Sequence, residues 1–318
     1  MKVLILAGLL AVALAAPPQS PMTTNYHEAI GIPEAARIKA AEEAMDFSGS
    51  RIAGGQQSSL GTNPWLGGLL ISLTNGFTSV CGSSLLTNTR SVTAAHCWFD
   101  GSNQAFMLTV VLGSTTLFTG GTRLNTNQVD MHANWTPSTI QNDVAIITIP
   151  WVTYSNTINN IALPTGNLLT NTFAGSVAVA AGYGRTAAGG AISNNQVQSH
   201  VSLQVITNAV CQSTYGSSII ASTLCTSGAG GQSTCGGDSG GPLAINTGGQ
   251  NVLVSYTGGY SHCSNGQPLL EARWKTRSNQ LSFPIQEEAI FTMAYFVKSP
   301  CSRIGRGYTN LALTHTNG

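Results

Sequence analysis

The chain has little charge, and over most of its length it has no lysine and no glutamate. Its 318 residues include 13 basic and 12 acidic side chains, which give a formal net charge of +1. This balance supplies no basic surface for nucleic acid or for an anionic membrane, so neither is expected as a partner. Residues 52–268 contain only seven charged side chains, against nine before them and nine after them. Charge therefore divides the chain into three parts.

Two further absences limit the kind of protein this is. No pair among the seven cysteines has the C-x-x-C spacing typical of a zinc site, and we expect no metal and no cofactor. No stretch is apolar over the roughly 20 residues that cross a bilayer.

Lys2 is followed by twelve apolar residues and a small-residue cleavage site, which predicts a secretory signal over residues 1–15. Export makes disulfides the default state of the cysteines.

The middle part lacks long helical periodicity and internal repeats. It has instead short apolar or alternating runs, separated by clusters of Gly, Asn, Ser and Thr, a pattern typical of β-strands. The expected strands are residues 69–73, 110–112, 144–149, 177–181 and 252–256. Pattern alone predicts an all-β fold, either a barrel or a sandwich.

Residues 16–51 differ from the middle part in composition. A proline-containing start leads to an Ala/Glu/Lys stretch over residues 34–45 that predicts a short helix. The segment ends at Arg51, directly before Ile52 and the nearly uncharged region. We interpret the Arg51–Ile52 junction as a processing site and residues 16–51 as an activation propeptide.

Three short motifs carry the chemistry. Ser239 lies in the run Gly-Asp-Ser-Gly-Gly at residues 237–241, a glycine-rich turn that can expose one hydroxyl and aim backbone N–H groups at one point. His96 lies in Thr-Ala-Ala-His-Cys, and Asp143 lies in Asn-Asp-Val-Ala-Ile. Each alone could be an ordinary turn or core residue. Together they supply a nucleophile, a base and a carboxylate that orients the base.

In the order His, Asp, Ser, these motifs resemble the chymotrypsin-like (trypsin-fold) serine peptidases. The glycine- and serine-rich sequence and the Ile-Ala-Gly-Gly start at Ile52 look most similar to the digestive chymotrypsins of insect midguts, of lepidopteran type. The resemblance implies two six-stranded antiparallel β-barrels with the active site in the cleft between them. The peptidase domain would cover residues 52–268, with barrel 1 at about 52–163 and barrel 2 at about 164–268.

The resemblance also implies a role for each motif residue. His96 would act as general base, Asp143 would fix its tautomer, and Ser239 would attack the scissile carbonyl. The backbone N–H groups of Gly237 and Ser239 would form the oxyanion hole. After cleavage at Arg51, the new amino group of Ile52 would pair with Asp238 and order that turn, so the precursor would be a zymogen.

Six cysteines follow the disulfide pattern of the family. The resemblance implies the pairs Cys81–Cys97, Cys211–Cys225 and Cys235–Cys263, with Cys301 left over.

Substrate preference depends on a few positions that the resemblance places around the primary pocket. Ser233 would form its floor, and Ser255, Tyr256 and Thr257 its wall. A trypsin needs a carboxylate at the floor, because an unpaired buried cation is very unfavourable. We therefore expect apolar side chains, aromatic or Leu, to bind, with an elastase-like preference for smaller ones as the alternative.

The function implied is digestion of dietary protein outside the cell, in the gut lumen. The expected partners are protein and peptide substrates, an activating trypsin-like peptidase and protein inhibitors of peptidases, and the chain is expected to be a monomer.

The resemblance fails after Pro268. The family continues with a strand that forms part of the pocket wall and with a short C-terminal helix, whereas residues 269–318 have a different, charged composition. This tail is either the product of a frameshift, retained intron or misjoined exon, or a genuine extension. A missing closing strand would leave an open barrel edge. The absence of both the strand and the helix would also favour a second hypothesis, a non-catalytic peptidase homologue or defective isoform.

Overall fold

The computed structural model describes residues 25–44, 56–185, 197–216, 219–221 and 223–258, with the backbone of residues 269–273. Several features expected from the sequence lie outside these residues: the signal at 1–15, the Arg51–Ile52 junction, Cys263 and the tail beyond residue 273. Strands make up most of the regular structure in the described part, which confirms the all-β fold. No helix there is both long enough and apolar enough to cross a membrane.

The first sheet closes into a six-stranded barrel. Its spatial order is β6 (Thr122–Thr126), β5 (Ala105–Leu112), β2 (Leu66–Leu73), β3 (Thr78–Thr87), β4 (Arg90–Thr93), β8 (Ala145–Thr148) and β7 (Val129–Met131). Only two residues separate β6 from β7, so these two form one bent strand. Its first half pairs with β5 and its second half pairs with β8, which joins the two ends of the sheet.

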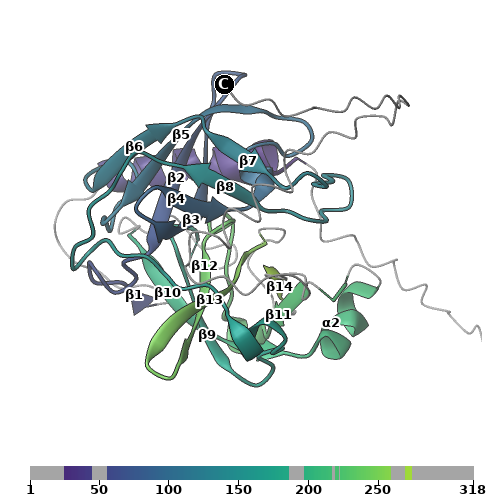
Figure 1. The fold of residues 1–318 in the computed structure, drawn as a ribbon. Coiled ribbons are helices and arrows are strands. Elements are labelled where there is room, and N and C mark those ends of the chain that lie inside the picture. Colours follow the sequence, from purple (N-terminus) through teal and green to yellow (C-terminus); the bar gives the residue numbers. More distant parts are fainter. Residues whose placement is uncertain are drawn as a thin grey trace, which may run out of the picture.

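The second sheet closes in a different way. Its order is β1 (Gln56–Gln57), β10 (Ser199–Ile206), β11 (Thr223–Thr226), β14 (Leu269–Arg273), β13 (Gln250–Thr257), β12 (Pro242–Thr247) and β9 (Val177–Gly182). Because β9 also pairs with β10, six strands form a ring and β1 adds to its edge. Both barrels are antiparallel, as the resemblance implied, and Figure 1 shows one lying above the other.

The strand expected to be missing after Pro268 is present. Residues 269–273 form β14, which pairs antiparallel with β11 on one side and with β13 on the other. This corrects the expectation of an open barrel. The physical reason is that a strand placed between β11 and β13 is held by backbone hydrogen bonds, and these do not depend on the family's side-chain motif. The expected C-terminal helix would lie beyond residue 273, outside the described residues.

Alternation along the strands directs apolar side chains inward. On β2, Leu69, Ile71 and Leu73 are buried in the first core, while the residues between them are partly exposed. All five strand ranges expected from the sequence fall on observed strands. The barrels touch closely at Gly82 and Gly241, where a Cβ on Gly82 would come within 2.7 Å of the Gly241 Cα.

Helices are few and short in the described residues. They are η1 (His27–Gly31), α1 (Ile32–Glu43), η2 (Ala95–Cys97), η3 (Gly166–Leu169), α2 (Asn208–Tyr215) and η5 (Ala229–Gly231). The helix expected over residues 34–45 is α1, which starts two residues earlier because Pro33 suits the first turn of a helix. η1 continues it toward the N-terminus as one wider turn.

Candidate active site

His96 is fixed at the inner end of the first barrel. It lies in η2, directly after β4, and its neighbour Cys97 is disulfide-bonded to Cys81 on β3. The Thr93 hydroxyl donates to the Gly82 carbonyl at 2.8 Å and ties the end of β4 to β3. These links hold the imidazole against the barrel, where only 2 % of the residue is exposed.

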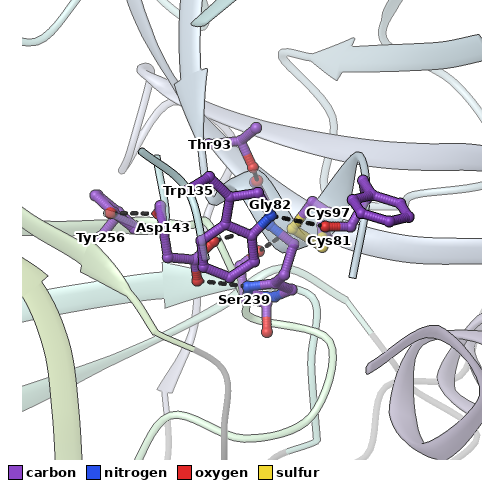
Figure 2. Close-up of polar contacts among 10 residues, drawn as sticks. Cys81, Gly82, Thr93, Cys97, Trp135, Asp143, Ser239 and Tyr256 are labelled. Atoms are coloured by element: carbon purple, nitrogen blue, oxygen red, sulfur yellow. Dashed lines mark hydrogen bonds and ion pairs between the residues drawn. A yellow bond between two sulfur atoms is a disulfide. The ribbon is translucent and has the colours of Figure 1, made fainter. Parts of the chain in front are cut away.

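Asp143 contacts His96 through both carboxylate oxygens. Its Oδ2 lies 2.7 Å from His96 Nδ1, and its Oδ1 accepts the His96 backbone N–H at 2.8 Å. The Tyr256 hydroxyl, on β13 of the other barrel, donates to the Asp143 carbonyl (Figure 2). Burial raises the pKa of Tyr256 well above its usual value, so the hydroxyl stays a donor. The loop carrying Asp143 is thus anchored from both barrels.

Ser239 lies at the junction of the barrels. Its carbonyl accepts the Gly82 N–H at 2.6 Å, which links the serine turn to β3 (Figure 2). Gly237 and Gly240, on either side of it, have φ values of +96° and +78°, a left-handed conformation that favours glycine. The Ser239 residue is 0 % exposed. The glycine-rich motif is therefore needed for the shape of the turn.

Asp238 points away from Ser239 into the second barrel. Its carboxylate accepts the Gly184 N–H at 2.8 Å and the Cys235 N–H at 3.0 Å. Burial raises the pKa of Asp238 to about 6, and these two N–H groups oppose the rise. A Cβ on Gly182 would lie 2.0 Å from the carboxylate, so only glycine fits beside it. Within the described part of the chain no ion pair reaches this carboxylate.

The expected pocket residues lie in two places. Ser233 is half-buried and lines the same hollow as Asp238, Gly182 and Gly184. Ser255, Tyr256 and Thr257 are consecutive buried residues at the end of β13. There the Thr257 backbone bonds to the serine turn, accepting the Gly240 N–H at 2.8 Å and donating to the Gly241 carbonyl at 2.9 Å.

All five cysteines in the described part of the chain are in disulfides. Disulfides join Cys81 to Cys97 and Cys211 to Cys225, and Cys235 is also disulfide-bonded. Its expected partner, Cys263, lies outside the described residues. Cys81 and Cys97 also lie near His96, but sulfurs joined in a disulfide are not thiolate ligands.

No motif in the sequence predicts that residues 25–44 lie in this site. They belong to the expected propeptide, yet the Tyr26 ring lies 4.5 Å from the His96 ring, centroid to centroid. The Tyr26 hydroxyl donates to the Val80 carbonyl at 2.9 Å. Glu34 is buried and pairs with Arg185 beside the serine turn. A lone tyrosine in a proline-led segment carries no motif, so only the structure reveals these contacts.

The chain is similar to known proteases over most of its length. The family model for trypsin matches residues 52–276, which includes β14. A collagenase of Hypoderma lineatum is 34 % identical over 69 % of this chain and 81 % of its own length. An alkaline trypsin of Manduca sexta is 35 % identical over 74 % of this chain and 88 % of its own. A solved collagenase structure superposes with a TM-score of 0.63 at 32 % identity, over 70 % of this chain and 93 % of that one. The chain belongs to the trypsin family of serine proteases.

Proposed function

We propose that the chain is a secreted serine endopeptidase, made as a zymogen, that cleaves after apolar residues with His96, Asp143 and Ser239. The observation that carries this proposal is the double contact from Asp143 to His96, set beside the glycine-shaped Ser239 turn. The strand whose absence would favour a non-catalytic homologue is present as β14. The C-terminal helix, the other element on which that hypothesis depends, would lie outside the described residues.

The geometry supports the following chemistry. With Asp143 accepting the Nδ1 proton of His96, the other ring nitrogen, Nε2, is the basic one. It takes the proton of the Ser239 hydroxyl as the oxygen attacks the scissile carbonyl, and then returns that proton to the leaving amine. Water repeats the sequence on the acyl-enzyme and releases the acid. The Asp143 carboxylate stabilises the imidazolium in both halves.

The developing oxyanion needs donors that are already in place. The left-handed backbone at Gly237 lets its N–H and that of Ser239 be directed to one point, as an oxyanion hole requires. Removing one such donor typically lowers kcat about 10²–10³-fold.

Zymogen control rests on Asp238. A buried carboxylate whose pKa is raised by desolvation is more stable when a cation joins it. Cleavage at Arg51 would create that cation, the α-amino group of Ile52, and its pairing with Asp238 would hold the neighbouring serine turn in place. A trypsin-like peptidase would make the cut, because the bond follows an arginine.

Specificity and location are the finer parts of the proposal. Ser233 offers a hydroxyl where a carboxylate would be needed for Lys or Arg substrates, so we propose aromatic or Leu side chains at the cleavage site. The signal-like residues 1–15 and the insect proteases among the relatives support secretion into a gut lumen for digestion.

The test is direct. The full chain is expressed, cut with trypsin and assayed with chromogenic peptides ending in Phe, Leu, Ala or Arg, with Ser239→Ala as the matched control. We expect cleavage after Phe or Leu, and labelling by an organophosphate that the control lacks. Absence of both cleavage and labelling would refute the enzyme proposal, and selective cleavage after Arg would refute the pocket assignment.

A further inference from the structure

Residues 25–44, which we call the covering segment, are built into the peptidase body. Tyr26 and Ile30 belong to the same apolar cluster as Cys81, Ala94 and Cys97. On α1, Ala35 and Ile38 join a second cluster with residues from both barrels, Leu66, Val80, Val111, Leu117, Ala181 and Tyr183. Figure 1 shows the segment, in purple, lying against the first sheet. Burial of this kind indicates a specific docked position.

Tyr26 lies where a substrate would react. Besides its contact with the His96 ring and its hydrogen bond to Val80, its hydroxyl lies beside the Ser239 hydroxyl and the Gly237 backbone. Burial raises the pKa of Tyr26 well above its usual value, and these two neighbours oppose that rise. A scissile carbonyl must reach the same Ser239 hydroxyl and Gly237 N–H. Tyr26 and a bound substrate therefore exclude one another.

The serine turn is covered from a second side. A Cβ on Gly236 would come within 2.9 Å of Ile30 and 3.6 Å of Glu34. Glu34 is itself buried and forms ion pairs with Arg37 and with Arg185 of the body. An exposed ion pair contributes little to stability, whereas a buried carboxylate that loses its partner is strongly unfavourable. The buried carboxylate of Glu34 is therefore the contact that ties α1 to the serine turn.

Both ends of the covering segment are also held. The His27 backbone N–H donates to Asp100 at 2.9 Å, and His27 Nδ1 lies 2.8 Å from the Ser79 hydroxyl. At the far end Glu42 accepts hydrogen bonds from the Leu117 and Phe118 N–H groups. Contacts therefore run along the whole length of the segment.

We propose that the covering segment is an inhibitor of the peptidase site, both within the uncut chain and as a free peptide after cleavage. This inference rests on the proposed function. No cysteine precedes Cys81 in the chain, so no disulfide can retain the segment once the Arg51–Ile52 bond is cut. The cut does not alter its contacts with Val80, Asp100 and Arg185. The released peptide therefore leaves and rebinds reversibly, and the enzyme becomes active only as the peptide is diluted or degraded.

The experiment uses the cut full chain freed of its peptide, and synthetic peptides spanning residues 16–51 with a fluorescent label. Fluorescence anisotropy measures binding without requiring activity, and chromogenic hydrolysis measures inhibition. Tyr26→Ala should weaken binding at least about 30-fold, as expected for a buried aromatic anchor. Lys39→Ala is the matched control, because this side chain is 58 % exposed and its one ion pair among the described residues is with Glu43 on its own helix. Its affinity should stay within about twofold.

Each outcome decides one question. Binding together with competitive inhibition, both weakened by Tyr26→Ala, supports the proposal. No binding, equal binding of the Tyr26→Ala peptide, or binding without inhibition of an active enzyme overturns it. If the freed enzyme cleaves nothing but still binds the peptide in a Tyr26-dependent way, the proposed function fails and the docking of the segment stands. Substituting the peptide alone leaves the folding of the enzyme untouched.

Discussion

Acidic pH should weaken the binding of the covering segment to the peptidase body, because His27 is buried in its neutral form. The pKa of His27 is lowered from 6.5 to about 4, mainly by burial; electrostatic repulsion from His96 also lowers it, while Asp100 and the His96 backbone oppose the shift. Above pH 6.5 the imidazole is neutral in both the free and the docked peptide, so binding is at full strength. As the pH falls from 6.5 toward 4, the free peptide gains a proton that the docked one cannot accept, and affinity is lost.

The magnitude follows from the two pKa values of His27. Affinity should fall about 30-fold between pH 7.5 and pH 5, and up to roughly 300-fold, about 3 kcal/mol, once the pH is well below 4. Glu42 acts in the opposite direction, because burial raises its pKa and the docked form then gains a proton as the pH falls. The loss attributed to His27 is therefore an upper value.

Anisotropy of the labelled peptide, titrated with the cut enzyme at pH 7.5, 6.5, 5.5 and 5.0, measures this directly. His27→Asn is the matched control, because an amide can still bond to Ser79 but does not titrate. For that variant the slope should vanish or reverse, leaving only the effect of Glu42. An unsubstituted peptide that binds equally well or better at pH 5 than at pH 7.5 would refute the reasoning.

Three further predictions concern the body itself. Asp143→Asn should lower kcat about 10⁴-fold without changing the fold, because an amide does not hold the His96 tautomer; a loss under tenfold in steady-state assays would argue against that role. Tyr256→Phe should lower the free energy of unfolding by about 1–2 kcal/mol through the lost hydrogen bond to Asp143, and urea melts that coincide would contradict this. Ser233→Asp should move cleavage toward Arg and Lys peptides, and an unchanged ranking of chromogenic substrates would show that Ser233 is not the pocket floor.

The parts of the fold that the sequence predicts are those with a local signal. Alternation on β2 and the apolar run of β9 mark strands because one face of each must be buried. The closure of the barrels came only from the resemblance, because pairing of β9 with β10 is a long-range contact. β14 lacks the side-chain motif of the family's closing strand, so the sequence does not predict it, and its place depends on backbone hydrogen bonds to β11 and β13.

The residues of the candidate site likewise differ in whether the sequence around them carries a local signal. His96, Asp143 and Ser239 are recognisable because their neighbours in the chain are constrained by geometry, such as the left-handed Gly237. Tyr26 has no such neighbours, and its position arises from packing against residues more than 50 positions away in the chain. Similarly, nothing in the residues around Tyr256 indicates that its hydroxyl meets Asp143 across the two barrels.

The covering segment and the barrels share apolar clusters, which under the proposed cleavage at Arg51 would set the lifetime of the enzyme. Tyr26, Ile30, Ala35 and Ile38 are core residues of the uncut protein, and releasing the segment exposes the surfaces that they cover. Burial of each large apolar side chain contributes about 1.5–3 kcal/mol to the free energy of unfolding, so under this proposal the uncut chain would be more stable than the cut enzyme. If the cut activates the chain as we propose, it would also start the gradual loss of folded enzyme, so the packing of the precursor would limit how long proteolysis lasts.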